Sequence, residues 1–233
     1  MALLDDVVEA NGGMTRWTSL KQFTLQLSIN GTLLSRTGRE MRLQDMVAEG
    51  MTQSQFVRIV GFTSPDVCGV YRPDRITIES LNGDILRAWD APQFDVLGQP
   101  RNWDDLHLAF FCGLSIWHYL TTPFLLAQAS IEVEELSPWC EDGQTWQRLR
   151  AVFPPDFPTS TAEQIFYFDS EYLQRRTDHD LFGSKIAHYS WAHQKFGDIV
   201  IPTLRRSLEL RPDGTTVKRP PLLDLEIFDA TFC

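Results

Sequence analysis

The longest apolar segment of this 233-residue chain runs from Trp103 to Leu126. Asn102 and Asp104 are residue types that cap helix N-termini, and Pro123 ends a helix because it lacks an N–H group. Between these ends the side chains are apolar on nearly every side of a helix, which is typical of a helix inside a core or a membrane. Four polar or small residues interrupt the run: His107, Gly113, Ser115 and His118. With these interruptions it falls short of the roughly 20 apolar residues of a membrane span, so we predict a buried core helix.

Segments with the pattern of β-strands lie on both sides of this helix. Residues Phe23 to Ile29 alternate apolar and polar side chains, as a half-buried strand does. Asn82-Gly83, between ITIESL and DILRAW, is a hairpin signal, and the later turns are so short that they join only antiparallel neighbours. Further strands are predicted at 40–48, 53–62, 67–71, 75–80, 131–136, 144–153, 163–169, 172–180, 185–194, 199–210 and 222–232.

Together these elements predict a mainly β (α+β) fold. We expect a large curved antiparallel sheet, an unclosed half-barrel, with the buried helix covering its concave face. Because no repeat, low-complexity tract or linker interrupts the pattern, residues 1–233 are predicted to form a single domain.

The connecting segments carry their own signals. Leu3 to Ala10 has helical spacing, and Asn11-Gly12-Gly13 is a C-terminal stop for that helix. Trp17 and Leu20 are expected to lead into the first strand, and Asn30-Gly31 to form a hairpin turn or a bulge after it. Pro92 and Pro100 predict a loop over residues 90–102.

Charge and cysteine content exclude some function classes. The net charge is −10 and the pI is near 4.9, which argues against binding to nucleic acid or to an anionic membrane, because both need a basic surface. The four cysteines lie far apart with no C-x-x-C pair, and the N-terminus has acids where a signal peptide has lysines. We therefore expect a cytoplasmic protein with reduced thiols.

Strong catalytic and cofactor signatures are missing from the sequence. It contains no G-x-S-x-G, G-x-G-x-x-G, Walker loop, H-E-x-x-H or EF-hand loop. We therefore predict no catalytic residue, no metal site and no cofactor, and the sequence leaves the oligomeric state open.

The buried helix offers the candidate ligand-binding residues. His107 and His118 are eleven residues apart, which leaves them about 20° apart on one helix face and about 16 Å apart along the axis, too far for a shared metal ion. One hypothesis is a stripe that lines a ligand cavity, formed by Trp103, His107, Phe111, Trp117 and His118. The alternative is two core histidines hydrogen-bonded to backbone or to strand side chains.

Three patterns in the later strands have both a functional and a structural interpretation. In Asp178-His179-Asp180 a carboxylate could orient a general base, but on a strand both aspartates face away from His179. Arg175-Arg176 and Arg205-Arg206 must each send one guanidinium to each face, where it binds an anionic head group or pairs across strands. The cross-strand partners we expect are acids such as Glu163, Asp169 or Glu209. Six aromatic residues are candidates for an aromatic pocket or for the core: Trp89, Trp103, Trp117, Tyr119, Trp146 and Trp191.

The chain also resembles a known superfamily. The opening helix up to Ala10-Asn11-Gly12-Gly13, Trp17 and the first long strand are similar to the LolA/LolB-type lipoprotein carriers of bacteria. HQKFGDIVIPTL (193–204) is similar to a pattern found late in the sequences of that superfamily. The pattern consists of an aromatic residue, a glycine, alternating hydrophobic residues and then Pro-Thr. Through YRPDRITIES, WDDLHLAFFCGLSIWHYLTTPF and EQIFYFD the chain also resembles a group of bacterial proteins. The superfamily resemblance implies an unclosed antiparallel barrel with an apolar cavity.

These observations lead to three functional hypotheses. The first is a cytoplasmic, cofactor-free protein that holds a hydrophobic small molecule, lipid or acyl chain between the curved sheet and the helix. The second is a small-molecule enzyme, an isomerase, cyclase or hydrolase, that uses a His/Asp acid–base pair in the same cavity. The third is a protein–protein module that uses a free sheet edge.

Overall fold

The computed structural model describes residues 2–37, 43–93, 97, 100, 103–217 and 220–233. Two compact units make up the chain. Residues 1–19 and 121–222 form the first, which we call the meander unit, and residues 20–120 and 223–233 form the second, which we call the helix unit. That the whole chain acts as a single domain stays a prediction.

The strands form one antiparallel, unclosed sheet. Among the described residues the hydrogen-bonded order is β6-β5-β4-β3-β2-β1-β13-β12-β11-β10-β9-β8-β7. The sheet is unclosed because this order is linear, with β6 and β7 as its two edge strands. The predicted fold class, mainly β with an unclosed antiparallel sheet and a helix packed against it, is confirmed.

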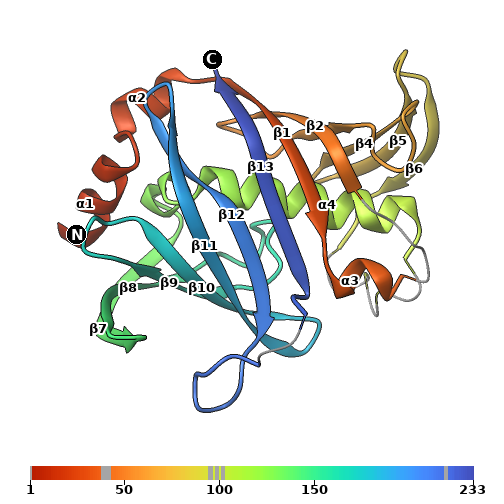
Figure 1. Ribbon diagram of the computed structural model, residues 1–233. Coiled ribbons are helices and arrows are strands. Elements are labelled where there is room, and N and C mark those ends of the chain that lie inside the picture. The colour runs from red at the N-terminus through yellow and green to blue at the C-terminus, as the bar shows by residue number, and fades with distance from the viewer. Residues whose placement is uncertain (1, 38–42, 94–96, 98–99, 101–102, 218–219) are drawn as a thin grey trace. The chain divides into compact units, whose positions relative to one another are not determined.

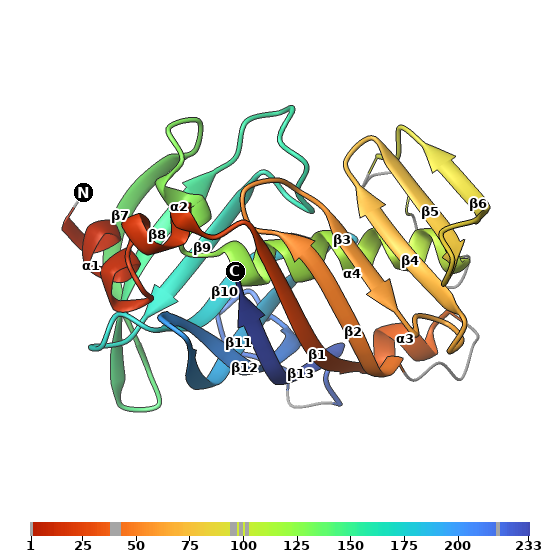
Figure 2. The ribbon, with the colours of Figure 1, turned by 90° about the horizontal axis from the view of Figure 1, so that it is seen from above.

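The helix unit contains seven of these strands. Hairpins join neighbours along the chain, and the C-terminal strand β13 pairs with β1 in antiparallel register. Figure 2 shows the helix α4 lying along one face of this unit's strands. The strands are β1 (Gln22–Asn30), β2 (Leu43–Met51), β3 (Val57–Val60), β4 (Val67–Arg72), β5 (Arg75–Ser80), β6 (Ile85–Asp90) and β13 (Leu223–Phe232).

Helix α4 (Asp105–Thr121) is the predicted core helix. Its apolar side chains are buried nearly all the way round, including Phe110, Phe111 and Ile116 at 4% exposed or less. Tyr71 of β4 stacks on Phe110 with the ring centroids 5.9 Å apart. Within the described residues, no helix combines the length and the apolar character that crossing a membrane requires.

Gly113 is the point of closest approach between α4 and the sheet. A Cβ atom built on Gly113 would lie 2.2 Å from the Cβ of Tyr71, far inside van der Waals contact. We expect Gly113→Ala to destabilise the protein by about 2 kcal/mol, although alanine has the higher helix propensity by about 1 kcal/mol. Ser115→Ala, two residues along the same helix, is the control and should change stability by less than about 0.5 kcal/mol. Urea unfolding measures both, and a Gly113→Ala protein as stable as the parent would contradict the close packing.

The meander unit contains the remaining six strands, each paired with its neighbour along the chain (Figure 1). They are β7 (Glu132–Glu141), β8 (Gln144–Val152), β9 (Glu163–Phe168), β10 (Gln174–Leu181), β11 (Ser184–Phe196) and β12 (Ile199–Glu209). This sequential order confirms the predicted meander. Strand β7 extends five residues beyond the predicted end at Leu136, because a register shift between Leu136 and Trp139 accommodates Pro138.

Short helices complete the meander unit. Helix α1 (Ala2–Ala10) ends as predicted, with the N–H of Gly13 donating to the carbonyl of Val8 at 3.0 Å. Gly12 is required because its φ is 127° and a Cβ would lie 2.5 Å from the carbonyl oxygen of Asp198. Trp17 of helix α2 (Met14–Ser19) stacks on Phe124 of the 3-10 helix η3 (Phe124–Ala127) at 4.3 Å.

Trp17 and Leu20 lead into β1 as predicted, and residues 14–19 form the short helix α2, which was not predicted and which buries the indole of Trp17 against Phe124. One local prediction was wrong. Asn30-Gly31 forms neither a hairpin turn nor a bulge: Gly31, with φ 133°, precedes the short helix α3 (Thr32–Ser35). The Asn82-Gly83 hairpin is confirmed between β5 and β6. Residues 40–42 of one predicted strand and much of the predicted loop at 90–102 lie outside the described residues.

Candidate functional site

The five predicted ligand-binding residues lie on α4 or just before it. The rings of Trp103 and Phe111 are 5.1 Å apart, and Trp117 meets His118 edge to face at 5.5 Å. The two tryptophans and Phe111 are buried, whereas His107 and His118 are half-buried. That these residues line a ligand cavity stays a prediction.

Backbone carbonyls satisfy the polar groups of both tryptophans. The indole N–H of Trp103 donates to the carbonyl of Leu97 at 2.8 Å. That of Trp117 donates to the carbonyl of Met51, on β2, at 2.9 Å. Each indole therefore has a fixed orientation and an apolar ring surface.

His107 is part of the start of α4. The carboxylate oxygen Oδ1 of Asp104 accepts hydrogen bonds from the backbone N–H of Leu106 and of His107, as an N-cap residue does. The same oxygen lies 2.6 Å from Nδ1 of His107, and Arg87 of β6 pairs with Oδ2. Burial alone raises the pKa of Asp104, but the hydrogen bonds from His107 and Arg87 outweigh it and hold this pKa well below its usual range.

This arrangement explains the His–Asp contact structurally. Asp104 is one of the two caps predicted from the sequence. The ring of His107 lies 5.1 Å from that of Trp89 on β6, so the histidine also packs α4 against this edge strand of its unit. Asp104 and His107 are thus a contacting His–Asp pair of the kind that the enzyme hypothesis requires. The carboxylate of Asp104, however, already caps the helix.

The meander unit holds a second polar and aromatic group that the sequence analysis did not single out. Its centre is the guanidinium of Arg176 on β10, which is 1% exposed. Nε and Nη2 of Arg176 donate to the two carboxylate oxygens of Asp178 at 2.6 and 2.8 Å, and Nη1 donates to Glu141 at 2.5 Å. Nη2 also donates to the carbonyl of Gly214 at 3.2 Å. We call Arg176, Asp178, Glu141, Tyr167 and Tyr189 the Arg176 network.

Aromatic rings surround this buried cation. The guanidinium carbon of Arg176 lies 4.9 Å from the ring of Tyr167 and 5.5 Å from that of Tyr189. The hydroxyl of Tyr167 donates to Asp178 at 2.7 Å, and that of Tyr189 donates to Glu141 at 2.5 Å. Burial and the nearby Asp178 carboxylate raise the pKa of Tyr167 to about 12, so its hydroxyl stays protonated and donates.

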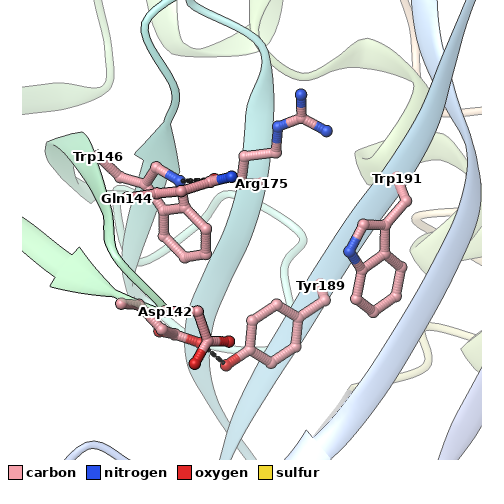
Figure 3. Close-up of a pocket in the computed structure, with 7 residues that line it drawn as sticks. Asp142, Gln144, Trp146, Arg175, Tyr189 and Trp191 are labelled. Atoms are coloured by element: carbon pink, nitrogen blue, oxygen red, sulfur yellow. Dashed lines mark hydrogen bonds between the residues drawn. The ribbon is translucent and has the colours of Figure 1, made fainter.

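A pocket of about 300 Å³ opens beside the Arg176 network. It is lined by Glu141, Asp142, Gln144, Trp146, Arg175, Tyr189 and Trp191. Figure 3 shows Trp146 and Trp191 on opposite sides, with Arg175 at one end and Asp142 at the other, the end at which the hydroxyl of Tyr189 donates to Glu141. Of the six aromatic residues proposed for a pocket, two therefore line this one.

Acids pair with Arg150, Arg175 and Arg176, whereas Arg205 donates to Ser190 and Arg206 lies over the ring of Trp191. Arg150 of β8 pairs with Glu163 at 2.7 Å, and Arg175 pairs with Asp169 at 2.5 Å. In each adjacent arginine pair one side chain is buried and the other is not. Arg176 is the buried member of its pair and lies opposite Tyr189, whereas Arg205 is the buried member of the other and lies opposite Ser190.

Arg205 shares its face of the sheet with two histidines, the buried His188 and the half-buried His179. Register places His179 beside Ile186 and His188 beside Thr177, on the face opposite the Arg176 network. Nδ1 of His188 lies 2.7 Å from Oγ of Ser207. Burial lowers the pKa of His179 to about 4 and, helped by the positive charge of Arg205, holds that of His188 well below its usual value. Asp178 binds Arg176 and Tyr167 and not His179. Asp178 therefore faces away from His179, as predicted, and the two residues form no catalytic dyad.

Three solved structures share this fold. Comparison of the sequence with family models and with curated proteins gives no match. A LolA-superfamily protein from Nitrosomonas europaea aligns over 99% of this chain and 91% of its own, with a TM-score of 0.54 and 9% identity. A proposed outer-membrane lipoprotein-sorting protein domain from Vibrio parahaemolyticus aligns over the same shares, with a TM-score of 0.55 and 9% identity. A DUF1329 family protein from Desulfovibrio piger ATCC 29098 aligns over 99% and 92%, with a TM-score of 0.53 and 12% identity. The predicted resemblance is thus confirmed at the level of structure: this chain has the fold of the LolA superfamily.

Proposed function

We propose that this protein binds a hydrophobic small molecule or an acyl chain against α4. The observation that carries the proposal is the character of the interface between α4 and the strands of its unit. The interface is formed by buried apolar side chains and includes the ring contacts of Phe110 with Tyr71 and of His107 with Trp89. Hydrophobic contact is not directional, so an alkyl chain can replace a displaced side chain without leaving a polar group unpaired.

The predicted lining residues suit this task. The N–H groups of Trp103 and Trp117 bind backbone carbonyls, so their rings offer apolar surface alone. His107 and His118 are half-buried at spaced positions along the helix and would contact a polar end of the ligand. The proposed cargo is therefore a long apolar molecule with a polar end.

The shared fold supports the proposal by analogy. One protein with this fold is a proposed lipoprotein-sorting domain, and lipoproteins carry acyl chains. A fold by itself does not establish a function, so the support comes second to the interface. We also propose that the protein acts in the cytoplasm, an expectation that its four free cysteines support.

Contact quenching tests where the ligand lies. We expect a brominated C18 fatty acid to quench tryptophan emission and to raise the Tm of the wild-type protein, because a ligand bound only to the folded state stabilises it. At a free concentration of about 100 times Kd the stabilisation is about 2.7 kcal/mol. Trp103→Phe and Trp117→Phe should together remove most of the quenching.

Trp191→Phe is the matched control, because Trp191 lies in the pocket of the meander unit. It should leave the brominated acid's quenching nearly intact. An unchanged Tm with fatty acids from C8 to C18 would refute acyl-chain binding. Quenching that disappears in Trp191→Phe, and persists without Trp103 and Trp117, would refute the placement at α4.

A further inference from the structure

The pocket of the meander unit has two chemically different ends. At one end stand hydrogen-bond donors, the guanidinium of Arg175 and the amide of Gln144. At the other end stand two carboxylates, Glu141 and Asp142, with the aromatic rings between the ends (Figure 3). The pocket volume of about 300 Å³ suits a small molecule. The two ends suit a molecule that carries both a positive and a negative charge.

The donor end is oriented by neighbouring residues. Nε and Nη2 of Arg175 both reach one carboxylate oxygen of Asp169, at 2.6 and 2.5 Å, which fixes the guanidinium. A guanidinium has five N–H groups, and a single oxygen atom cannot accept hydrogen bonds from all of them. Arg175 can therefore also donate to a ligand carboxylate or phosphate. Oε1 of Gln144 accepts from the indole N–H of Trp146 at 3.2 Å, so Nε2 is the end of this amide that can donate to a ligand.

The acceptor end combines charge with aromatic surface. Asp142 is exposed at the tip of the β7–β8 hairpin, where Asp142 and Gly143 have φ values of 48° and 76°. Trp191 is 37% exposed and lies parallel to Tyr189, with ring centroids 5.6 Å apart. A carboxylate next to aromatic faces is the environment that binds an alkylammonium group, by charge and by cation–π attraction.

We propose that this pocket binds a zwitterion whose ammonium group lies at Asp142 and the aromatic rings and whose carboxylate or phosphate lies at Arg175 and Gln144. The site is separate from the acyl-chain site proposed at α4 and uses different residues. The zwitterion is either a free small molecule or the head group of a lipid, and both present the same two charges.

Calorimetric titration of the full chain with phosphocholine tests the proposal. We expect saturable binding of phosphocholine, and affinities for choline alone and for inorganic phosphate alone that are weaker by about tenfold or more, because each half-probe uses one end of the pocket. Dihexanoylphosphatidylcholine, below its micelle concentration, separates the two sources. Affinity well above that of phosphocholine identifies a lipid head group, and equal affinity identifies a soluble zwitterion.

Two variants separate the two ends. Asp142→Asn keeps the turn, because Asn-Gly suits this hairpin as well as Asp-Gly does, and should weaken phosphocholine and choline about threefold to fivefold without affecting phosphate. Gln144→Glu should weaken phosphocholine and phosphate but not choline. Asp156→Asn, an exposed acid of the same unit outside the pocket, is the control and should change none of the three.

Two results would overturn the assignment. One is the absence of saturable phosphocholine binding at millimolar concentrations. The other is phosphocholine binding that Asp142→Asn and Gln144→Glu both leave unchanged. Neither result bears on the acyl-chain site, whose probe carries no ammonium group and whose variants lie on α4.

Discussion

Arg176→Met is expected to reduce the free energy of unfolding by about 3–5 kcal/mol. The substitution removes the cation that holds Glu141 and Asp178, whose side chains are only 20% and 14% exposed. Two largely buried carboxylates would then face each other across the rings of Tyr167 and Tyr189 without a positive charge between them. Urea unfolding at pH 7.5, with the midpoint and the slope fitted separately, measures the loss.

Arg150→Met is the matched control for this prediction. Arg150 also pairs with two acids, Glu134 at 3.3 Å and Glu163 at 2.7 Å, but all three side chains are exposed to solvent. Exposed pairs contribute about 0–1 kcal/mol, so this variant should be close to the wild type. Equal losses in the two variants would show that burial of Arg176 does not matter. Arg176→Lys should recover only part of the loss, because an ammonium group lacks the planar fork that meets Asp178 through two nitrogens.

Acid is expected to destabilise the protein between pH 6.5 and pH 4. Burial lowers the pKa of His179 to about 4, and burial with the nearby charges of Arg175 and Arg205 lowers that of His193 to about 4. In the unfolded chain both titrate near 6.5, so over this window the unfolded state binds protons that the folded state does not. The free energy of unfolding should therefore fall by about 1.4 kcal/mol per pH unit for each histidine.

The slope of the free energy of unfolding against pH identifies the groups responsible for the acid destabilisation. His179→Gln and His193→Gln are neutral at every pH, so each should lower the slope by about 1.4 kcal/mol per unit. His188, whose pKa burial also lowers, adds to the fall in the same direction. Asp104, with its pKa held low by His107 and Arg87, loses its contribution only at more acidic pH, because its unfolded value lies near 4. Unfolding free energies that stay constant from pH 7 to pH 5 would contradict the prediction.

Local pattern was sufficient for most of the fold. The apolar run of α4, its cap Asp104 and the alternation in the strands are properties of a few neighbouring residues, and the structure confirms them. The rule that adjacent arginines face opposite ways depends only on the period of two in a strand, and the continuous register of Arg205 and Arg206 confirms it for that pair. At Arg175 a shift in strand register interrupts the period. Helix α2, which contains Trp17, was not predicted because it is only six residues long, too short to show a periodic pattern.

The candidate sites needed the tertiary structure. The pocket joins residues from Glu141 to Trp191. Strands β9 and β10 separate β8 from β11 in the sheet, so only the folded chain brings the β7–β8 hairpin to β11, where the hydroxyl of Tyr189 donates to Glu141. The sequence predicted that the two arginines of each pair lie on opposite faces, but both faces of these strands carry apolar residues, so it did not show which arginine is buried. The sequence by itself therefore determined the helix, the strands and their antiparallel order, because periodicity is local. The tertiary structure decided which charges are buried and which side chains meet, because burial depends on what packs against each face.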